Sequence, residues 1–279
     1  MRRVAVIGSG ISGLSVAHGL RDDARVTLFE AGDYFGGHTH TVDMTLDGVT
    51  HGVDTGFLVL NERTYPNLLR LFSELGVEIA KSDMSFSVQV PGSGLEWSGC
   101  DLNTVFAQRR NLVRPRFWRM LADLMRFNKL ATALAESGGA AELDQPIGAF
   151  LMRHRFSDEF RDWYFLPMIG CIWSCPVDQM LRFPVATMIR FCHNHGLIQV
   201  ANRPQWYTVR GGARTYVRKM LATIADARLN TPVLRVRRVV DPRGPSVQVS
   251  TAAGTERFDE VLMGCHRVQS LALLAEPSA

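Results

Sequence analysis

The sequence lacks any uninterrupted apolar run of about 18 residues, the length that a membrane-spanning helix requires. It therefore predicts no transmembrane segment. The first apolar run begins directly after Met1, which leaves no room for a secretion signal. We expect a cytoplasmic protein, and peripheral contact with a membrane surface stays open as an alternative.

Cysteine is scarce, with five residues in a chain of 279. An odd number of cysteines in a cytoplasmic protein argues against disulfides. A zinc site could be suspected at Cys171, Cys175 and Cys192, which are followed by His193 and His195. However, the spacings C-x-x-x-C and C-H-N-H match no standard zinc site. We expect buried free cysteines and no metal ion.

Lysine is almost absent, since 28 of the 31 basic residues are arginine. The net charge of +4 is mild, and no nucleic-acid-binding motif is present, so we expect no nucleic-acid partner. One arginine cluster is compatible with an anionic headgroup or membrane surface. It is equally typical of a solvated helix face whose arginine stems cover a core, which we favour because the stretch is short. The cluster comprises Arg109, Arg110, Arg114, Arg116 and Arg119, with Phe117 and Trp118 among them.

The strongest signal lies at the N-terminus, where three glycines follow a short apolar run in the spacing G-x-G-x-x-G. A strand, a glycine-rich turn, a helix, a second strand and an acid in this order predict a dinucleotide-binding βαβ unit. Along the chain these are strand 3–7, Gly8, Gly10, Gly13, helix 11–20, strand 26–29 and Glu30.

Each residue type in this unit serves nucleotide binding in its own way. Gly8 permits the tight turn, Gly10 lets the backbone approach a pyrophosphate, and Gly13 lets the helix pack closely on the strand. The helix N-terminus offers N–H groups and a positive dipole end to phosphates. The Glu30 carboxylate accepts hydrogen bonds from ribose hydroxyls and disfavours a 2′-phosphate.

A second glycine pair, Gly36–Gly37, follows Glu30 after six residues. A nicotinamide-binding unit does not need this second glycine pair. FAD is long and binds in an extended form, so the backbone must approach it closely at a second place near its diphosphate. Next comes a hairpin with its turn at Asp47–Gly48, and its return strand leads to the loop 54–57, which could also reach the cofactor. A nicotinamide-dependent dehydrogenase is the alternative, and the glycine pair and a large insert argue against it.

Helical patterns dominate the middle of the chain. Helices are predicted at 66–75 and from Pro115 to about Glu136, with a strand at 85–90. The pair Gly211–Gly212 opens a helix where the chain returns to the first domain. We therefore predict a discontinuous FAD-binding domain, 1–60 and 206–279, and an inserted, mainly helical substrate domain, 61–205.

The motifs G-S-G-I-S-G, E-A-x-x-x-x-G-G and V-D-T-G-F resemble those of the flavin-containing amine oxidase and phytoene desaturase superfamily. Within it, GGHTHT, HGVDTGFLVLNERTYPNL, SDMSFSV, RRNLVRPRFWRM, IWSCP and HNHGL resemble a bacterial family of FAD-dependent (NAD/FAD-binding) oxidoreductases. The resemblance implies an α/β fold, with a Rossmann-like FAD-binding domain of the glutathione-reductase type and a helical insert.

The resemblance also implies FAD as cofactor and a set of residues around it. His38 stands where the superfamily commonly has arginine, and the backbone of Val233 matches a strand that touches the adenine. The implied set is Gly8, Ser9, Gly10, Ile11, Ser12, Gly13, Glu30, Ala31, Gly36, Gly37, His38, Thr39, Thr55, Gly56, Phe57 and Val233.

The implied reaction is hydride transfer to the flavin from a C–H bond of a small molecule, either an amine or a lipid-like substrate. The hydride step requires no acid or base, so His193, His195 and Tyr207 are only candidates. A helix end capped by Gly196 explains the two histidines completely, and we favour that interpretation. Superfamily members have a further C-terminal portion. A truncated FAD-binding remnant without activity, or one half of a split enzyme with a partner chain, is therefore the alternative.

Overall fold

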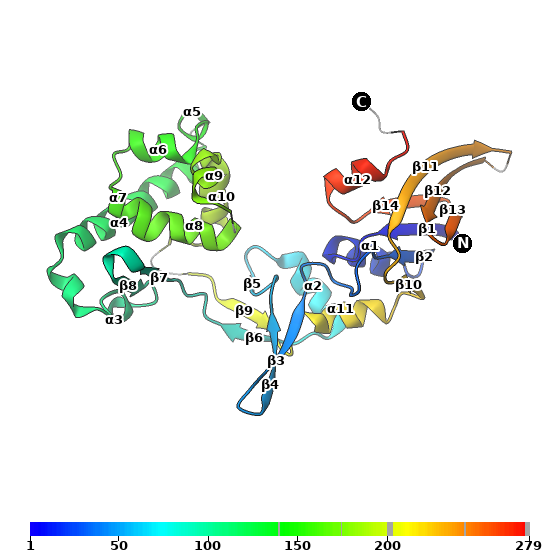
Figure 1. The fold of residues 1–279 in the computed structure, drawn as a ribbon, viewed down its shortest axis with the longest axis horizontal. Helices are drawn as coiled ribbons and strands as arrows, with labels where there is room; N and C mark the ends of the chain where they lie inside the picture. Colours follow the sequence, from blue (N-terminus) through cyan, green and yellow to red (C-terminus); the bar gives the residue numbers. More distant parts are fainter. Residues whose placement is uncertain (139, 174, 200–202, 243, 277–279) are drawn as a thin grey trace. The chain divides into compact units, whose positions relative to one another are not determined.

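The computed structural model describes residues 1–138, 140–173, 175–199, 203–242 and 244–276 (Figure 1). The chain divides into two compact units. We call one the sheet unit, which comprises Met1–Leu60, Pro66–Ser82 and Tyr207–Ala279. The other, the helical unit, comprises Asn61–Tyr65 and Asp83–Trp206.

A parallel sheet organises the sheet unit, with its strands in the order β10-β2-β1-β14. The central strand β1 pairs on both sides, with Val4 opposite Val26 on β2 and Glu260 on β14. The strands of a parallel sheet have both faces covered by other elements, which explains the apolar run of β1. The α/β class predicted from the sequence is confirmed. The strands are β1 (Arg2–Ile7), β2 (Ala24–Phe29), β10 (Asp226–Arg228) and β14 (Glu260–Met263).

Helices and an antiparallel sheet complete this core. Helix α1 packs against α11. At the end of α1, Nδ1 of His18 lies 2.9 Å from the hydroxyl oxygen of Thr223. The antiparallel strands β11, β12 and β13 contribute Phe258, whose ring meets that of Phe29 edge-on at 5.9 Å. The elements are α1 (Ile11–Gly19), α11 (Arg214–Leu221), β11 (Val233–Asp241), β12 (Gly244–Thr251), β13 (Gly254–Phe258) and α12 (Arg267–Leu273).

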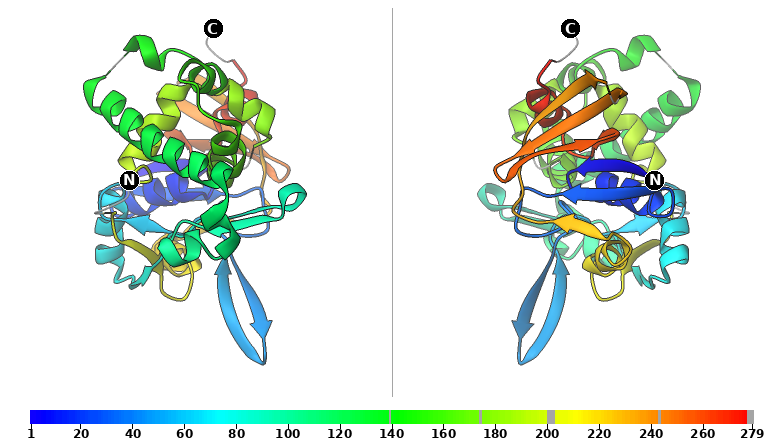
Figure 2. Two further views of the ribbon diagram at one scale, coloured as in Figure 1. Left: turned by 90° about the vertical axis from the view of Figure 1, so that its left-hand side faces the viewer. Right: turned by 90° about the vertical axis from the view of Figure 1, so that its right-hand side faces the viewer.

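The predicted hairpin is present as β3 (Thr41–Leu46) and β4 (Val49–Asp54) and forms a separate two-stranded ribbon (Figure 2). Its turn residues Asp47 and Gly48 have φ of 50° and 78°. Positive φ at both positions is the geometry of a tight hairpin turn, which Asp-Gly favours.

The segment Pro66–Ser82 belongs to the sheet unit, whereas the sequence placed it in the insert. Its helix α2 (Pro66–Leu75) packs on α11, where the Phe72 and Tyr216 rings lie 5.1 Å apart. Lys219 on α11 donates to the carbonyls of Leu75 and Gly76 at the end of α2. The chain passes between the units near β5 (Leu60–Asn61), β6 (Ile79–Ser82) and β9 (Trp206–Val209).

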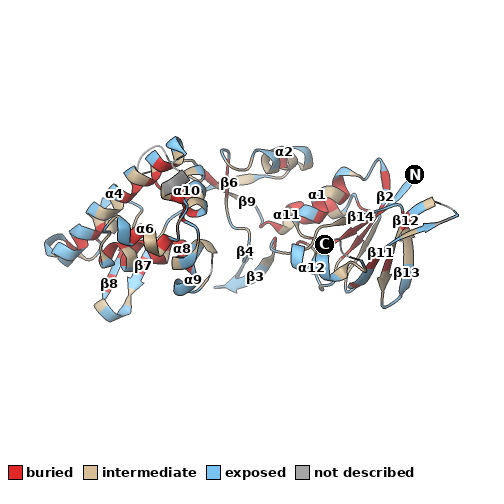
Figure 3. Ribbon diagram, turned by 90° about the horizontal axis from the view of Figure 1, so that it is seen from above, coloured by how far each residue is buried: buried red, intermediate tan, exposed pale blue. Residues whose placement is uncertain are grey.

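The helical unit is built around one long helix, α4 (Pro115–Ser137). The helix begins at a proline and ends before Gly138, whose φ of 67° is that of a left-handed cap. Buried residues follow one face of α4 (Figure 3). Helices α7 (Asp158–Phe160) and α10 (Val185–Asn194) and a π-helical turn (Arg161–Phe165) pack on it. The unit also contains β7 (Ser87–Val90), β8 (Leu95–Ser98), α3 (Leu102–Val105), α5 (Ala140–Leu143), α6 (Ile147–Arg153), α8 (Leu166–Trp173) and α9 (Val177–Arg182).

Arginines of the 109–119 cluster have partners within this unit. The guanidinium groups of Arg114 and Arg116 lie 4.9 and 5.2 Å from the ring centre of Trp163. Arg116 and Arg119 both pair with the carboxylate of Glu159, a residue only 5% exposed. These contacts favour the structural interpretation of the cluster. Within the described residues, no helix combines the length and apolar character needed to cross a bilayer.

Truncating the side chain of Phe127 on α4 should lower the denaturant concentration at which the helical unit unfolds. Phe127 is fully buried, and its ring lies 5.2 to 5.8 Å from those of Phe156, Phe160 and Phe165. Phe127→Ala should cost about 3–5 kcal/mol, because it removes these contacts and leaves a cavity. Urea unfolding followed by circular dichroism measures the change. Met125→Ala, at an exposed position of the same helix, is the control and should stay within about 0.5 kcal/mol of wild type.

Candidate cofactor site

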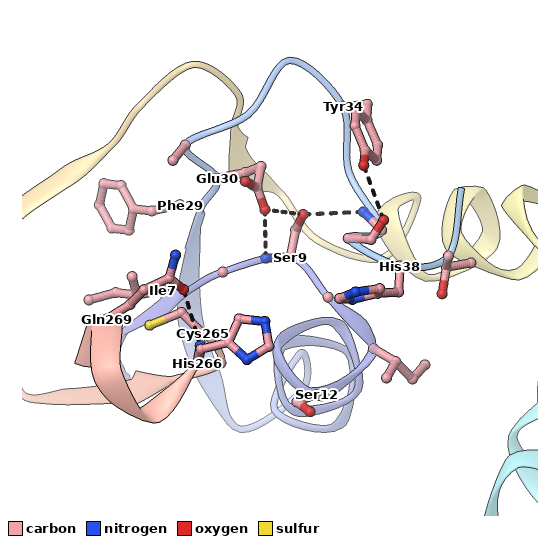
Figure 4. Close-up of a pocket in the computed structure, with 18 of the residues that line it drawn as sticks. Ile7, Ser9, Ser12, Phe29, Glu30, Tyr34, His38, Cys265, His266 and Gln269 are labelled. Atoms are coloured by element: carbon pink, nitrogen blue, oxygen red, sulfur yellow. Dashed lines mark hydrogen bonds between the residues drawn. The ribbon is translucent and has the colours of Figure 1, made fainter. Parts of the chain in front are cut away.

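A cavity of about 840 Å³ lies in the sheet unit at the carboxyl ends of β1, β2 and β14 (Figure 4). In open α/β sheets this is the edge at which ligands bind. Its walls are the β1–α1 turn, the end of β2 and the loop after it, Thr55–Gly56, Val233, the segment Gly264–His266, and one side of α12.

The three glycines of the β1–α1 turn have three different roles. Gly8 has a φ of 97°, and a Cβ on Gly13 would lie 1.8 Å from the Gly8 carbonyl oxygen. These two glycines are therefore required by the fold itself. A Cβ on Gly10 would meet no atom within 4 Å, and Gly10 lines the cavity. Its missing side chain leaves room for a ligand to approach the backbone.

Ser9 joins three segments of the site by hydrogen bonds (Figure 4). Its backbone N–H and its hydroxyl donate to Oε2 of Glu30, at 2.9 and 2.5 Å. The N–H of Gly36 donates to the Ser9 hydroxyl and carbonyl oxygens, at 3.2 and 3.1 Å. Ser9 is fully buried. It therefore fixes the glycine turn, the end of β2 and the second glycine pair relative to one another.

The Glu30 carboxylate is held in its charged form. Burial acts to raise the pKa of this carboxyl, but hydrogen bonds from Ser9 and the backbone of Gly32 outweigh burial and keep the pKa below its usual value. Oε1 accepts from the Gly32 N–H at 2.8 Å, while Oε2 accepts both bonds from Ser9. A carboxylate offers about four acceptor positions, so Oε1 retains capacity for a ligand hydroxyl.

The second glycine pair is needed for close backbone packing. Gly36 and Gly37 have φ of 121° and 58°, and a Cβ on Gly37 would lie 3.1 Å from the Gly10 Cα. A Cβ on Gly56 would lie 2.2 Å from the carbonyl oxygen of His38. Thr39 is anchored through its hydroxyl, 2.7 Å from that of Tyr216 on α11. The loop 36–40 is therefore clamped against the turn that carries Gly10.

The loop that follows β4 contributes less than the sequence suggested. Thr55 and Gly56 line the cavity, but Phe57 does not. The carboxylate of Asp54 accepts hydrogen bonds from the Thr41 hydroxyl and the backbone N–H of Ala213, at 2.5 and 2.9 Å. Asp54 therefore holds the Gly211–Gly212 turn rather than lining the site.

The structure brings together the whole implied set except Gly13 and Phe57. Gly13 packs behind the turn, where its Cα lies near Gly264. Sequence reasoning missed a wall formed after β14, although the rejoining of β14 to the sheet places its end beside that of β1. The added lining residues are Ile7, Phe29, Tyr34, His40, Gly264, Cys265, His266, Gln269, Ala272 and Leu273.

The three candidates for proton transfer lie outside this cavity. His195 belongs to the helical unit, where its ring stacks on Phe191 at 4.0 Å and its Nδ1 lies 2.9 Å from the Phe191 carbonyl oxygen. Nε2 of His193 lies 3.9 Å from the Glu136 carboxylate. Tyr207 lies on β9. None of them lines the cavity described above.

Solved structures with this fold match the chain along almost its whole length. Cyclohexylamine oxidase from Brevibacterium oxydans is 21% identical with a TM-score of 0.71, and covers 99% of this chain and 61% of its own. A CLA-producing fatty acid isomerase from P. acnes is 17% identical with a TM-score of 0.66. The match covers 99% of this chain and 62% of the isomerase. Putrescine oxidase bound to putrescine is 21% identical with a TM-score of 0.67. The match covers 94% of this chain and 57% of the oxidase. The chain thus spans about six tenths of these structures.

Comparison with curated protein sequences found no match. The sequence profile of the flavin containing amine oxidoreductases, in contrast, matches residues 11–269. This match covers nearly the whole chain and agrees with the Rossmann-like architecture and its cavity. The chain belongs to the flavin-containing amine oxidoreductase family, and its cofactor is FAD.

Proposed function

We propose that the sheet unit binds FAD in its 840 Å³ cavity and that the protein oxidises a C–H bond of an apolar, lipid-like substrate. The observation that carries the proposal is the cluster in which buried Ser9 joins the glycine turn to Glu30 and Gly36. It holds, within one cavity, a backbone cradle suited to a diphosphate and a carboxylate suited to a ribose.

The cavity fits the ADP half of FAD in three respects. The space over Gly10 is open, so a diphosphate could approach the backbone. The N-terminus of α1 has no capping side chain and no acid in its first turn, which favours an anion there. Glu30 is ionised with acceptor capacity on Oε1, which suits ribose hydroxyls.

Bound FAD would supply a two-electron acceptor, which no side chain provides. The contribution of this chain is to bind and orient the cofactor. The turn at Gly8–Gly10 would hold the diphosphate, Glu30 would hold the ribose, and Val233 would border the adenine; all of these residues line the cavity. His193 and His195 have structural partners in the helical unit, so neither is assigned a proton-transfer role.

A second cavity, of about 470 Å³, lies in the helical unit and favours a lipid-like substrate over an amine. Its walls are mainly apolar, and its one charged lining residue among those described is Arg182. An ammonium group would find no negative charge in this lining. A substrate carboxylate could pair with Arg182 in place of Asp178, an exposed residue whose carboxylate lies 3.0 Å from the Arg182 guanidinium. The similar structures do not favour either substrate, since they include both a fatty acid isomerase and two amine oxidases. The lining residues are Ile147, Ile169, Trp173, Cys175, Gln179, Met180, Arg182, Phe183 and Pro184.

A chain that binds FAD but needs a partner chain, or is inactive alone, is the second candidate. The share of the solved structures that the chain spans, about six tenths, favours it. FAD binding is common to both candidates, and oxidation of a substrate by this chain alone separates them.

Two glycine variants test the cofactor site. Gly10→Ala should keep the fold, because φ is −61° and the added methyl group meets no atom, but it should weaken FAD binding at least ~10-fold by filling the cradle. Gly13→Ala should instead destabilise the unit by about 1–3 kcal/mol or more, because its Cβ overlaps the Gly8 carbonyl oxygen. Thermal melting and the absorbance of FAD retained after desalting measure the two effects. Unchanged FAD retention by Gly10→Ala would contradict the proposed site.

Glu30→Gln tests the carboxylate. A pKa that is lowered on folding adds stability above the unfolded value of about 4.3, and this stability is lost as the pH falls through the lower folded value. Between neutral pH and about pH 3, the melting temperature of the wild type should therefore fall further than that of Glu30→Gln. At neutral pH the variant should bind FAD more weakly. Asp33→Asn, an exposed acid in the same loop, is the control and should change neither property.

Anaerobic bleaching of the flavin absorbance tests the substrate. An unsaturated fatty acid should reduce FAD in the loaded protein, and an alkyl amine of equal length should not. Arg182→Gln should raise the fatty acid concentration needed ~10-fold, since it removes the cation of the lining, while Arg190→Gln, exposed on α10, should not. Bleaching by the amine alone refutes the lipid-like substrate, and retention of FAD without bleaching by either compound favours the second candidate.

A further inference from the structure

The cofactor cavity lacks a permanent cation. Among the described residues that line it, none is a lysine or an arginine, and Glu30 supplies a negative charge. The lining groups that can become positive are the imidazoles of His38, His40 and His266. FAD carries a diphosphate with two negative charges, so its binding here depends on backbone N–H groups and on these imidazoles. This inference rests on the proposed FAD site.

Two of the three imidazoles form a pair. The rings of His38 and His266 have centroids 6.2 Å apart and stand nearly perpendicular, at 89°. They come from segments far apart in sequence and lie beside the first turn of α1, near Ser12 (Figure 4). Both line the same cavity as Gly10. The pair therefore lies where an anion bound at the N-terminus of α1 would be.

The backbone holds both members of the pair in place. The His38 carbonyl oxygen accepts from the Phe57 N–H at 3.1 Å. The His266 N–H donates to the Gln269 side chain at 3.2 Å, and the His266 carbonyl oxygen accepts from the Ser270 N–H at 2.8 Å. His40 differs, because its Nδ1 lies 3.0 Å from the Thr55 hydroxyl and its ring packs on Tyr34.

The other titratable groups around the pair have partners of their own. Glu30 accepts from Ser9 and Gly32, the Tyr34 hydroxyl donates to the Gly37 carbonyl oxygen at 3.2 Å, and the Cys265 thiol lies 3.3 Å from the Ser270 hydroxyl. Arg267 follows His266 in sequence, but it is exposed and does not line the cavity.

We propose that His38 and His266 together bind the FAD diphosphate as a proton-dependent pair, in place of a permanent cation. An ordinary imidazole gains its proton near pH 6.5. Phosphate oxygens beside the rings favour the protonated forms of both imidazoles. By linkage, FAD should bind more tightly in mildly acidic than in mildly alkaline solution.

The test is the dissociation constant of FAD at about pH 6 and about pH 8, measured by calorimetry. The wild type should bind ~10-fold more weakly at the higher pH, because the pair loses its charge. His38→Gln and His266→Gln should each remove most of this difference by weakening binding at the lower pH. His38→Arg should bind more tightly than the wild type at pH 8, since its charge is permanent, and should keep only the part of the pH dependence that His266 contributes. His51→Gln, exposed on β4, is the control and should behave as wild type.

Two further ligands separate the pair from the site as a whole. ADP, which keeps the diphosphate, should show the same pH dependence as FAD, and adenosine, which lacks it, should show none. FAD binding with equal affinity at both pH values would overturn the pair and leave the proposed FAD site intact. Failure of both FAD and ADP to bind at either pH would overturn the pair and the site together.

Discussion

The hydrogen bonds of one buried serine are the constraint on which the cofactor site depends. Ser9 directs its N–H and hydroxyl to Glu30 and accepts the N–H of Gly36. Because Ser9 is fully buried, an unmade bond there would cost about 1–3 kcal/mol. The same bonds position the glycine turn and keep Glu30 ionised. The cavity is therefore preorganised by contacts within the protein, and Glu30 has a structural role beside its proposed contact with ribose.

The N-terminal βαβ unit could be predicted because its signals are local. Gly8, Gly10 and Gly13 are set by the geometry of a single turn, and the structure gives each a separate reason for lacking a side chain. The Asp47–Gly48 hairpin was equally predictable, since positive φ at adjacent positions needs these residue types. The fold class followed from the order of these elements, and the family match confirms it.

The features that sequence reasoning missed depend on contacts between distant segments. The wall formed by Gly264 and His266 exists because β14 pairs with β1 across most of the chain, with Met263 opposite Ile7. Helix α2 joins the sheet unit because Phe72 packs on Tyr216. No local pattern encodes these contacts, since α2 has the same amphipathic sequence whichever unit it packs against. Phe57 illustrates the reverse error, because adjacency in sequence to Gly56 did not place it in the cavity.

The distribution of arginine explains why imidazoles matter at this site. In a chain with 28 arginines, a cation beside the diphosphate would be easy to supply, yet three of the 109–119 cluster, Arg114, Arg116 and Arg119, lie against Glu159 or Trp163. At the cofactor cavity the corresponding position is His38, with His266 facing it from the β14–α12 turn. A permanent cation would strengthen binding equally at all physiological pH values, whereas two imidazoles make the strength depend on protonation. In the proposed site, the backbone cradle, which is fixed by Ser9, would determine where FAD binds, and the imidazole pair would determine how tightly.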